Sequence, residues 1–366
     1  MVHPPADLSP HGIASRVARW ADQGPQGPLT LELYPTLTCN LDCRFCDTTD
    51  RHRKPVDELP TERLLELVDE AADLGVRRVF VLGGGEPLVR RDTPRVLRRI
   101  KDHGMEGILT TNATLMGASI ARELVACAWD EVHVSIDGPT AQIHDDLRGQ
   151  RGAFRKTVQA TCRLRVLRDQ LGAAAPRIAL HFVLTRRNAD SLTQMVELAR
   201  ALGAFRVDFD ALIAYTPEQR ALQLTDAQRA ALPARAAQAQ ERAEALGIAT
   251  TLEHFRHPER LDRGDLAVPL PEGEGLRGAP CLKAWHYLVV QADGRTSPCC
   301  VLAGEGGSVA AQPLAAAWRS DPFLQSVREG MLRKEPLPRC RECSWNILSH
   351  EAAIREALPA VRPGGS

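Results

Sequence analysis

Residues 31–47 read LELYPTLTCNLDCRFCD and combine a short strand-forming segment with three closely spaced cysteines. Leu31–Tyr34 has the length and apolar content of a strand. Cys39, Cys43 and Cys46 follow with C-x3-C-x2-C spacing, which holds three thiolates close together on one short loop. The segment therefore predicts a cysteine loop directly after the first strand of the fold.

Downstream of this loop, apolar runs alternate with helical patterns. Strands alternating with helices indicate βα units and a parallel sheet. Active-site residues in such sheets gather at the C-terminal ends of the strands, where the cysteine loop is expected. Further strands are expected at 78–82, 107–110, 132–136, 178–184 and 206–210, with helices near 60–74, 91–103, 116–126, 154–171 and 191–202.

The spacing of the three cysteines favours an iron–sulfur cluster. A four-iron cubane needs four thiolate ligands to be saturated, so three leave one iron open to another molecule. The alternative is a zinc knuckle, which needs a closed set of four ligands. His52 is the nearby candidate for a fourth ligand. The spacing favours the cluster over zinc.

The composition limits the classes of protein to which the chain can belong. Lys+Arg and Asp+Glu are balanced at 46 each, which argues against nucleic acid as a partner. No apolar run reaches the length of a membrane span, and the N-terminus lacks the pattern of a secretory signal. We therefore expect a cytoplasmic protein with no membrane partner. Its ten cysteines are then expected to be metal ligands rather than disulfides.

At the cysteine loop the chain resembles the radical S-adenosylmethionine (SAM) superfamily, whose signature has an aromatic residue, here Phe45, before the last cysteine. The resemblance implies a partial (β/α)6 TIM-like barrel. It also implies that the open iron chelates the amino and carboxylate groups of SAM. An electron from the cluster then cleaves SAM to methionine and a 5′-deoxyadenosyl radical.

Three further motifs are similar to SAM-binding motifs of that superfamily. The run GGGEP at 83–87 resembles its GGE motif, which implies that Glu86 binds the SAM amino group while Gly84 and Gly85 line the approach. The alternative for this run is an ordinary glycine-rich turn.

Ser135 and Asp137 end the fourth expected strand and point to the same side, which suits the ribose or methionine end of SAM. Their alternative is a turn, for which Asp-Gly-Pro is good chemistry. The run HDDLRG at 144–149 resembles an HDxxRG run of relatives, which implies that Arg148 binds the SAM carboxylate. A surface salt bridge is the alternative for Arg148. Asn188 is a weaker candidate for binding SAM.

A second cysteine set lies near the C-terminus. Taken alone, it also fits a zinc ribbon or a rubredoxin-like iron site. Behind the first motif it resembles a SPASM/Twitch module, and its number of cysteines matches the shorter Twitch form. That resemblance implies one fully ligated auxiliary [4Fe–4S] cluster. Its expected ligands are Cys281, Cys299, Cys340 and Cys343, and Cys300 makes the choice of the second ligand ambiguous.

The chain is expected to divide into five segments. These are an N-terminal extension (1–29), the radical SAM barrel (30–215), a helical connection and linker (216–278), the auxiliary cluster domain (279–348), and a C-terminal helix with a disordered tail (349–366).

The expected activity is that of an oxidoreductase-type radical SAM enzyme. The radical would abstract a hydrogen from a small molecule or peptide, and the auxiliary cluster would accept an electron in a net oxidation, either a dehydrogenation or a crosslink. The resemblance also implies an external electron donor such as flavodoxin or ferredoxin. Cys300, Asp210 and Tyr215 are candidates for catalysis, and none is assigned a role.

Two alternatives to this activity remain at the level of sequence. The first is a redox-neutral radical epimerase that uses Cys300 as hydrogen donor. The second is a non-catalytic iron–sulfur electron carrier or scaffold, which predicts no binding of SAM.

Overall fold

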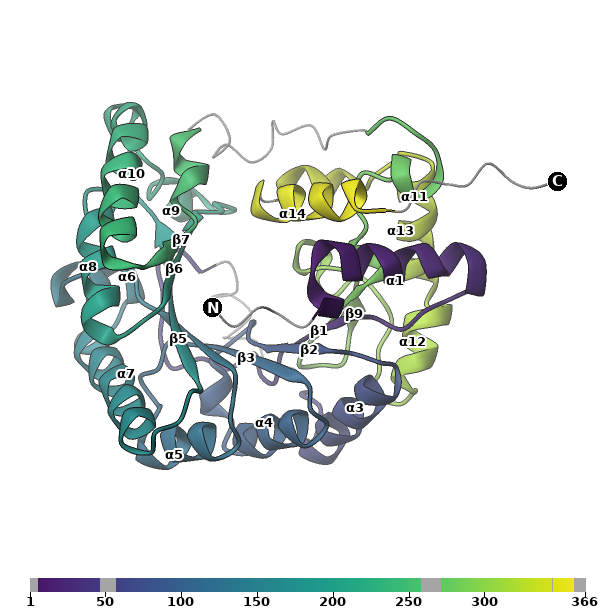
Figure 1. The fold of residues 1–366 in the computed structure, drawn as a ribbon, viewed down its shortest axis with the longest axis horizontal. Coiled ribbons are helices and arrows are strands. Elements are labelled where there is room, and N and C mark those ends of the chain that lie inside the picture. The colour runs from purple at the N-terminus through teal and green to yellow at the C-terminus, as the bar shows by residue number, and fades with distance from the viewer. Residues whose placement is uncertain (1–5, 47–56, 258–270, 344, 359–366) are drawn as a thin grey trace.

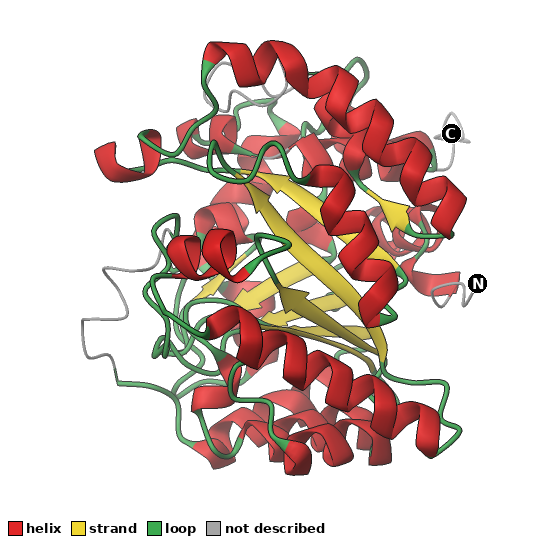
Figure 2. Cartoon of the chain, turned by 90° about the vertical axis from the view of Figure 1, so that its left-hand side faces the viewer, coloured by secondary structure: helices red, strands yellow, loops and turns green. Residues whose placement is uncertain are grey.

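The computed structural model describes residues 6–46, 57–257, 271–343 and 345–358. Within them one nine-stranded sheet has the order β7-β6-β5-β4-β3-β2-β1-β8-β9, and only the β8–β9 pair is antiparallel. The sheet curves around a central space and carries helices on its outer face (Figures 1 and 2). The strands are β1 (Thr30–Leu33), β2 (Arg78–Val81), β3 (Glu106–Thr111), β4 (Glu131–Ser135), β5 (Arg177–Leu184), β6 (Arg206–Ala211), β7 (Ala249–Thr250), β8 (Tyr287–Val290) and β9 (Thr296–Ser297).

Helices connect the successive parallel strands, as the expected βα pattern requires. The predicted fold class, α/β with a partial TIM-like barrel, is confirmed, and the six predicted strands agree with β1 to β6 to within one residue at each end. The helices that follow these strands are α3 (Thr61–Asp73), α4 (Thr93–Asp102), α5 (Ala118–Ala126), α6 (Ala141–Arg148), α7 (Ala153–Gln170), α8 (Leu192–Leu202), α9 (Pro217–Arg220) and α10 (Asp226–Leu246).

The remaining helices flank the barrel. They are α1 (Pro10–Gln23) before it and α11 (Gly275–Gly278), α12 (Leu314–Ser320), α13 (Pro322–Leu332) and α14 (Trp345–Glu356) after it. Short 3-10 turns are η1 (Ala6–Leu8), η2 (Pro87–Val89), η3 (Leu252–Arg256), η5 (Lys283–Trp285), η6 (Cys300–Leu302) and η7 (Pro338–Glu342).

The alternation of side chains along the strands decides which residues face the central space. In β5, Leu180 and Phe182 are fully buried in the core. Because successive side chains point to opposite faces of a strand, His181 and Val183 point into the barrel, where both line a cavity. The apolar side chains on the outer face of the sheet pack against the helices, and polar side chains can occupy the inner face.

The C-terminal module continues the barrel sheet. Strand β8 pairs in parallel with β1, in a register that sets Thr30 opposite Tyr287. The sequence predicted a six-stranded barrel and a separate module. In the structure the module instead supplies a strand to the barrel sheet. A six-stranded barrel would leave one edge of β1 unpaired, and β8 covers that edge, as native proteins commonly protect exposed edge strands. The short β7 extends the opposite edge of the sheet.

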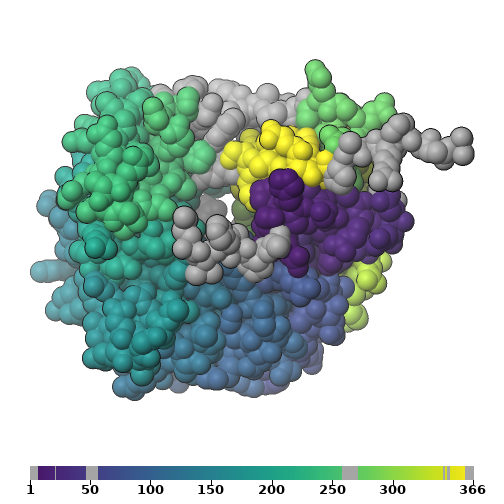
Figure 3. Space-filling model, in the orientation of Figure 1, coloured from purple at the N-terminus to yellow at the C-terminus, as the bar shows by residue number. Residues whose placement is uncertain are grey.

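The N-terminal helix α1 packs against the C-terminal helix α14, and the two lie side by side on one face of the molecule (Figure 3). The Trp20 indole donates a hydrogen bond to the carbonyl of Trp285. The Arg328 guanidinium lies over the rings of both Trp20 and Trp318. The first segment of the chain is therefore part of the C-terminal module in space.

Several sequence-based expectations fall outside the described residues. They include His52, part of the expected helical connection and linker (258–270 of 216–278) and the end of the expected tail (359–366). In the described part of the chain, no helix is both long enough and apolar enough to cross a membrane.

Candidate active site and auxiliary cluster pocket

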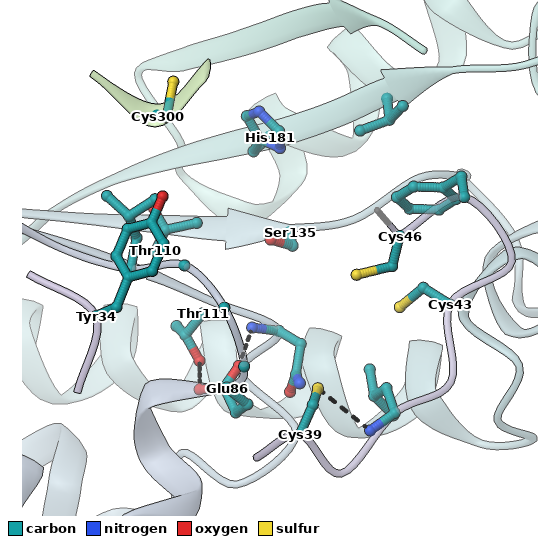
Figure 4. Close-up of a pocket in the computed structure, with 18 of the residues that line it drawn as sticks. Tyr34, Cys39, Cys43, Cys46, Glu86, Thr110, Thr111, Ser135, His181 and Cys300 are labelled. Atoms are coloured by element: carbon teal, nitrogen blue, oxygen red, sulfur yellow. Dashed lines mark hydrogen bonds between the residues drawn. The ribbon is translucent and has the colours of Figure 1, made fainter. Parts of the chain in front are cut away.

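A cavity of about 440 Å³ opens at the carboxyl ends of the barrel strands (Figure 4). The cysteine loop forms one side, and Cys300 from the C-terminal module lies across the cavity from it. The cavity thus brings the two cysteine-bearing parts of the chain to one space. Its lining includes Cys39, Cys43, Cys46, Gly84, Gly85, Glu86, Ser135, Arg148, His181, Tyr215 and Cys300.

Two glycines hold the cysteine loop by close backbone packing. A Cβ at Gly85 would lie 2.1 Å from the carbonyl oxygen of Thr38, and one at Gly149 would lie 2.2 Å from that of Asp42. Gly149 also has a φ of +65°, which L side chains rarely adopt. The glycines of the GGGEP and HDDLRG runs are therefore required where these runs contact the loop.

Hydrogen bonds fix the far end of the loop. The Arg44 N–H donates to the carbonyl of Leu147 at 2.9 Å. The Gln219 side chain of α9 donates to the carbonyl of Cys46, also at 2.9 Å. Both partners come from elements that flank the cavity, so the barrel itself positions the cysteines.

The thiols of the loop already accept hydrogen bonds. The Leu41 N–H donates to Cys39 Sγ at 3.5 Å, and Arg148 Nη1 donates to Cys43 Sγ at 3.7 Å. Burial raises the pKa of Cys43 to about 11, and the positive charge of Arg148 opposes that rise. Donors and a cation that face sulfur favour thiolate ligands, and this donor set fits an iron–sulfur cluster.

All three cysteines of the loop line the cavity. Among the residues that the structure describes, no three His, Cys, Asp or Glu side chains converge closely enough to hold one metal ion. The three cysteines on one cavity match the three-thiolate set expected for a cluster with one open iron.

Glu86 is buried at the edge of the cavity and accepts hydrogen bonds through both carboxylate oxygens. Its Oε1 accepts from Thr111 Oγ1 at 2.6 Å and from the Leu88 N–H at 3.0 Å, and its Oε2 accepts from the Asn112 N–H at 2.7 Å. Burial raises the pKa of Glu86, and these bonds oppose the rise. A carboxylate offers about four acceptor sites, so one remains for a ligand that carries an ammonium group.

Arg148 forms a buried ion pair with Asp137, in which Nε lies 2.5 Å from Oδ2. Its guanidinium also lies over the ring of Phe45, at 5.2 Å from the ring centroid. Asp137 is fully buried and does not line the cavity. Arg148 therefore lines the cavity, whereas Asp137 lies behind it as the ion-pair partner of Arg148.

Asn188 also lies away from the cavity. Its amide donates to the carbonyls of Asp137 and Val183, both at 2.9 Å, and its Oδ1 accepts from the Thr185 N–H. These bonds tie the ends of β4 and β5 together. Of the residues that the sequence suggested for SAM binding, Gly84, Gly85, Glu86, Ser135 and Arg148 line the cavity, while Asp137 and Asn188 stand behind it.

The sequence reasoning missed His181, which lines the cavity and bonds to Asp210. Its Nε2 lies 2.7 Å from Asp210 Oδ2. Burial lowers the pKa of His181, but the hydrogen bond and charge of Asp210, with Asp208 and Asp137, outweigh it, so the net shift is upward. The alternation of β5, with its large apolar residues at even positions, was the signal that could have placed His181 inside the barrel.

A second, smaller pocket of about 40 Å³ lies in the C-terminal module. Four cysteines line this pocket, and the rest of its wall is largely apolar and includes Leu302, Val327 and Met331. Burial raises the pKa of the Cys340 thiol to about 12. A pocket with four thiols and a largely apolar wall fits a fully ligated cluster. The four thiols are those of Cys281, Cys299, Cys340 and Cys343.

Two adjacent cysteines of this module, Cys299 and Cys300, line different pockets. Cys299 lines the small pocket and Cys300 lines the central cavity, into which its side chain is exposed. The backbone of Cys299 is extended (φ −165°, ψ 167°), and successive residues of an extended chain point to opposite sides. Val301 lines both spaces, so a single layer of residues separates them.

Comparison with known proteins identifies a family for the barrel and another for the C-terminal module. The profile of the radical SAM superfamily matches residues 33–169, and the SPASM profile, described as an iron–sulfur cluster-binding domain, matches residues 281–344. An AdoMet-dependent heme synthase of Methanosarcina barkeri is 28% identical over 85% of this chain and 86% of its own length. A PqqA peptide cyclase of Granulibacter bethesdensis is 30% identical over 87% of this chain and 81% of its own length.

Solved structures show the same fold. SuiB of Streptococcus suis, in a crystal structure with its precursor peptide SuiA, aligns with a TM-score of 0.66 at 19% identity, over 86% of this chain and 70% of that one. The two profiles match in the order in which the two cysteine sets occur. This order, together with the similarity to relatives along most of the chain, shows that the chain belongs to the radical SAM superfamily, among the enzymes that carry a SPASM iron–sulfur domain.

Proposed function

We propose that this enzyme removes hydrogen from a peptide or a small molecule in a net two-electron oxidation, as a dehydrogenation or a crosslink. The single layer of residues between the central cavity and the auxiliary pocket carries the proposal. Cys299 and Cys300 are adjacent in the chain yet line different spaces, and Val301 lines both. An electron that leaves a substrate in the cavity has a short path to the auxiliary pocket.

The family implies SAM and [4Fe–4S] clusters as cofactors, with an auxiliary cluster in the SPASM domain. When bound, these groups supply the electron that cleaves SAM to the hydrogen-abstracting 5′-deoxyadenosyl radical, and an acceptor for the electron that the substrate later loses. In our proposal Cys39, Cys43 and Cys46 hold the first cluster. Cys281, Cys299, Cys340 and Cys343 hold the auxiliary one.

The residues around the cavity bind and orient SAM. We assign the amino group to Glu86, which lines the cavity and keeps one acceptor site beyond the three hydrogen bonds that it accepts. We assign the carboxylate to Arg148, since its fork of donors suits a carboxylate and it already contacts Cys43. Gly84, Gly85 and Ser135 line the remaining approach.

His181 is the proton acceptor in this proposal. After a substrate C–H bond gives its hydrogen atom to the adenosyl carbon, the substrate radical must lose one proton and one electron to become an oxidised product. The proton goes to His181, because Asp210 orients the imidazole through Nε2 and leaves Nδ1 as the acceptor. An auxiliary cluster held by Cys281, Cys299, Cys340 and Cys343 would supply the acceptor for the electron.

The peptide class is supported by the relatives, which include a PqqA peptide cyclase, and a small molecule remains part of the proposal. The reducing electron would come from an external donor such as flavodoxin or ferredoxin. The test is mass spectrometry of peptide pools incubated anaerobically with reconstituted enzyme, SAM and reductant. We expect a product lacking two hydrogen atoms, formed together with 5′-deoxyadenosine. A product of unchanged mass would overturn the oxidation.

A second candidate function is redox-neutral epimerisation, which the exposure of Cys300 in the cavity favours. A thiol there can return a hydrogen atom to a substrate radical from across the cavity. Incubation in heavy water separates the two functions. An epimerised product takes up one solvent deuterium, and the Cys300→Ala variant loses that label, whereas an oxidised product gains none at the attacked carbon.

The pH profile of product formation tests the role of His181. The neutral imidazole is the acceptor, so product formation should rise with pH through the raised pKa of His181, above its ordinary value. Asp210 and Asp208 on β6 and Asp137 after β4 set that pKa, and Arg148 partly compensates Asp137. Loss of a positioned base typically costs about 10²- to 10⁴-fold. His181→Gln should lose the rising limb while 5′-deoxyadenosine still forms.

Asp210→Asn supplies the matched control, because it keeps a side chain of the same shape and removes the charge. It should move the rising limb to lower pH, since the carboxylate no longer stabilises the imidazolium. If His181→Gln shows the wild-type profile, the proton acceptor is another residue.

A further inference from the structure

Lys283 is a cation in the wall of the auxiliary pocket. It follows Cys281 by two positions, at the start of η5, and lines the pocket together with the four cysteines. Its Nζ lies 3.9 Å from the centroid of the Tyr287 ring. A cation over an aromatic face is held in place by the ring, so the position of this charge is fixed.

No carboxylate described in the structure forms an ion pair with Lys283. Among the described side chains, the charges of Glu351 and Glu32 raise the pKa of Lys283, but their hydrogen bonds go to other groups. Glu351 is fully buried and bonds to the Leu282 N–H at 2.9 Å and to His286 at 3.3 Å. Glu32 accepts hydrogen bonds from the phenols of Tyr34 and Tyr287. Arg355 donates to the carbonyls of residues 279 and 280.

A half-buried charge beside a dry pocket is costly unless an opposite charge compensates it. A cluster bound by four thiolates carries a net negative charge and gains another on reduction. The pocket next to Lys283 has the ligands for such a cluster, so a negative group bound there would supply the adjacent counter-charge that none of the described carboxylates supplies as an ion pair.

A chain of side-chain contacts links Lys283 to the central cavity. Its ring partner Tyr287 donates a hydrogen bond to Glu32, and Tyr34, which bonds to the other oxygen of Glu32, lines the cavity. Lys283 therefore lines the auxiliary pocket and is connected through these side chains to the space proposed for the substrate.

We propose that Lys283 is a positioning residue that compensates the charge of the auxiliary cluster and raises its reduction potential. A fixed cation stabilises the reduced, more negative state over the oxidised one, and charges and hydrogen bonds around a cluster tune its potential in this way. This proposal rests on the proposed oxidation in one respect: a higher potential would favour transfer of the substrate's electron to the auxiliary cluster. The effect on the potential needs the bound cluster alone.

The test is a redox titration of the holoenzyme followed by electron paramagnetic resonance, with the Cys39/Cys43/Cys46→Ala variant used to assign the auxiliary signal. Lys283→Met should make reduction of the auxiliary cluster at least tenfold less favourable, which is about 59 mV for a one-electron couple. Lys283→Arg, which keeps the charge, should stay near the wild-type potential. If Lys283→Met does not retain its iron, Lys283→Gln is titrated in its place.

An unchanged potential in an iron-replete neutral variant would overturn the role of Lys283. An equal shift in Lys283→Arg would overturn it as well, because the shift would then not come from charge. No substrate is present in the titration, so failure of the proposed oxidation would leave its result intact.

Discussion

Replacement of Cys39, Cys43 and Cys46 by alanine should abolish 5′-deoxyadenosine formation and leave the auxiliary cluster in place. The two cysteine sets line separate spaces, and the loop cysteines pack in a different cluster of buried side chains from Cys281, Cys299 and Cys340, so loss of one set need not disturb the other. The purified variant should hold about four irons per chain rather than about eight. Iron analysis and chromatographic measurement of 5′-deoxyadenosine under anaerobic conditions check both parts.

Cys162→Ala is the matched control for this experiment. Cys162 is exposed on α7 and lines neither pocket, so its loss should change neither iron content nor SAM cleavage. Cleavage of SAM by the triple variant at the wild-type rate would contradict the assignment of the cysteine loop.

Arg148→Met should cost about 3–5 kcal/mol of stability, because removal of one partner from a buried pair leaves an uncompensated charge. The remaining partner is Asp137, which is fully buried and has Arg148 at 2.5 Å. The Val183 N–H, which donates to Asp137 Oδ1 at 2.9 Å, does not replace the lost positive charge. Urea unfolding followed by circular dichroism measures the loss as a lower midpoint.

The double variant Arg148→Met/Asp137→Asn separates the structural role of Arg148 from its role toward SAM. It removes both charges, so much of the stability should return. Affinity for SAM should stay low if Arg148 also binds the SAM carboxylate. Full recovery of affinity together with stability would leave Arg148 with a structural role only.

The strands and the cysteine loop could be predicted from sequence because their signals are local. Apolar runs between helical patterns gave the positions of β1 to β6, and C-x3-C-x2-C spacing gave the loop. The pairing of β8 with β1 has no local signal, since it joins residues 30–33 to residues 287–290. Helix α6 was missed because the run HDDLRG at 144–149 was interpreted only as a ligand-binding motif.

The site was harder to predict where one polar group binds another rather than a ligand. Asp137 and Arg148 both looked like groups that bind SAM, yet in the fold they are each other's partner. The His181–Asp210 contact joins two strands across 29 positions, and neither residue has a motif around it. The choice between Cys299 and Cys300 depends on the extended backbone at residue 299, which the spacing alone does not fix.

The pairing of β8 with β1 also has a consequence for how the chain folds during synthesis. β1 leaves the ribosome early, but its second neighbour follows some 250 residues later. At about 5–20 residues per second, β1 would keep one open edge on the order of ten to fifty seconds. Such an edge invites pairing with other chains until β8 arrives. Chaperone demand and aggregation in expression should therefore be greatest for chains that end before residue 287.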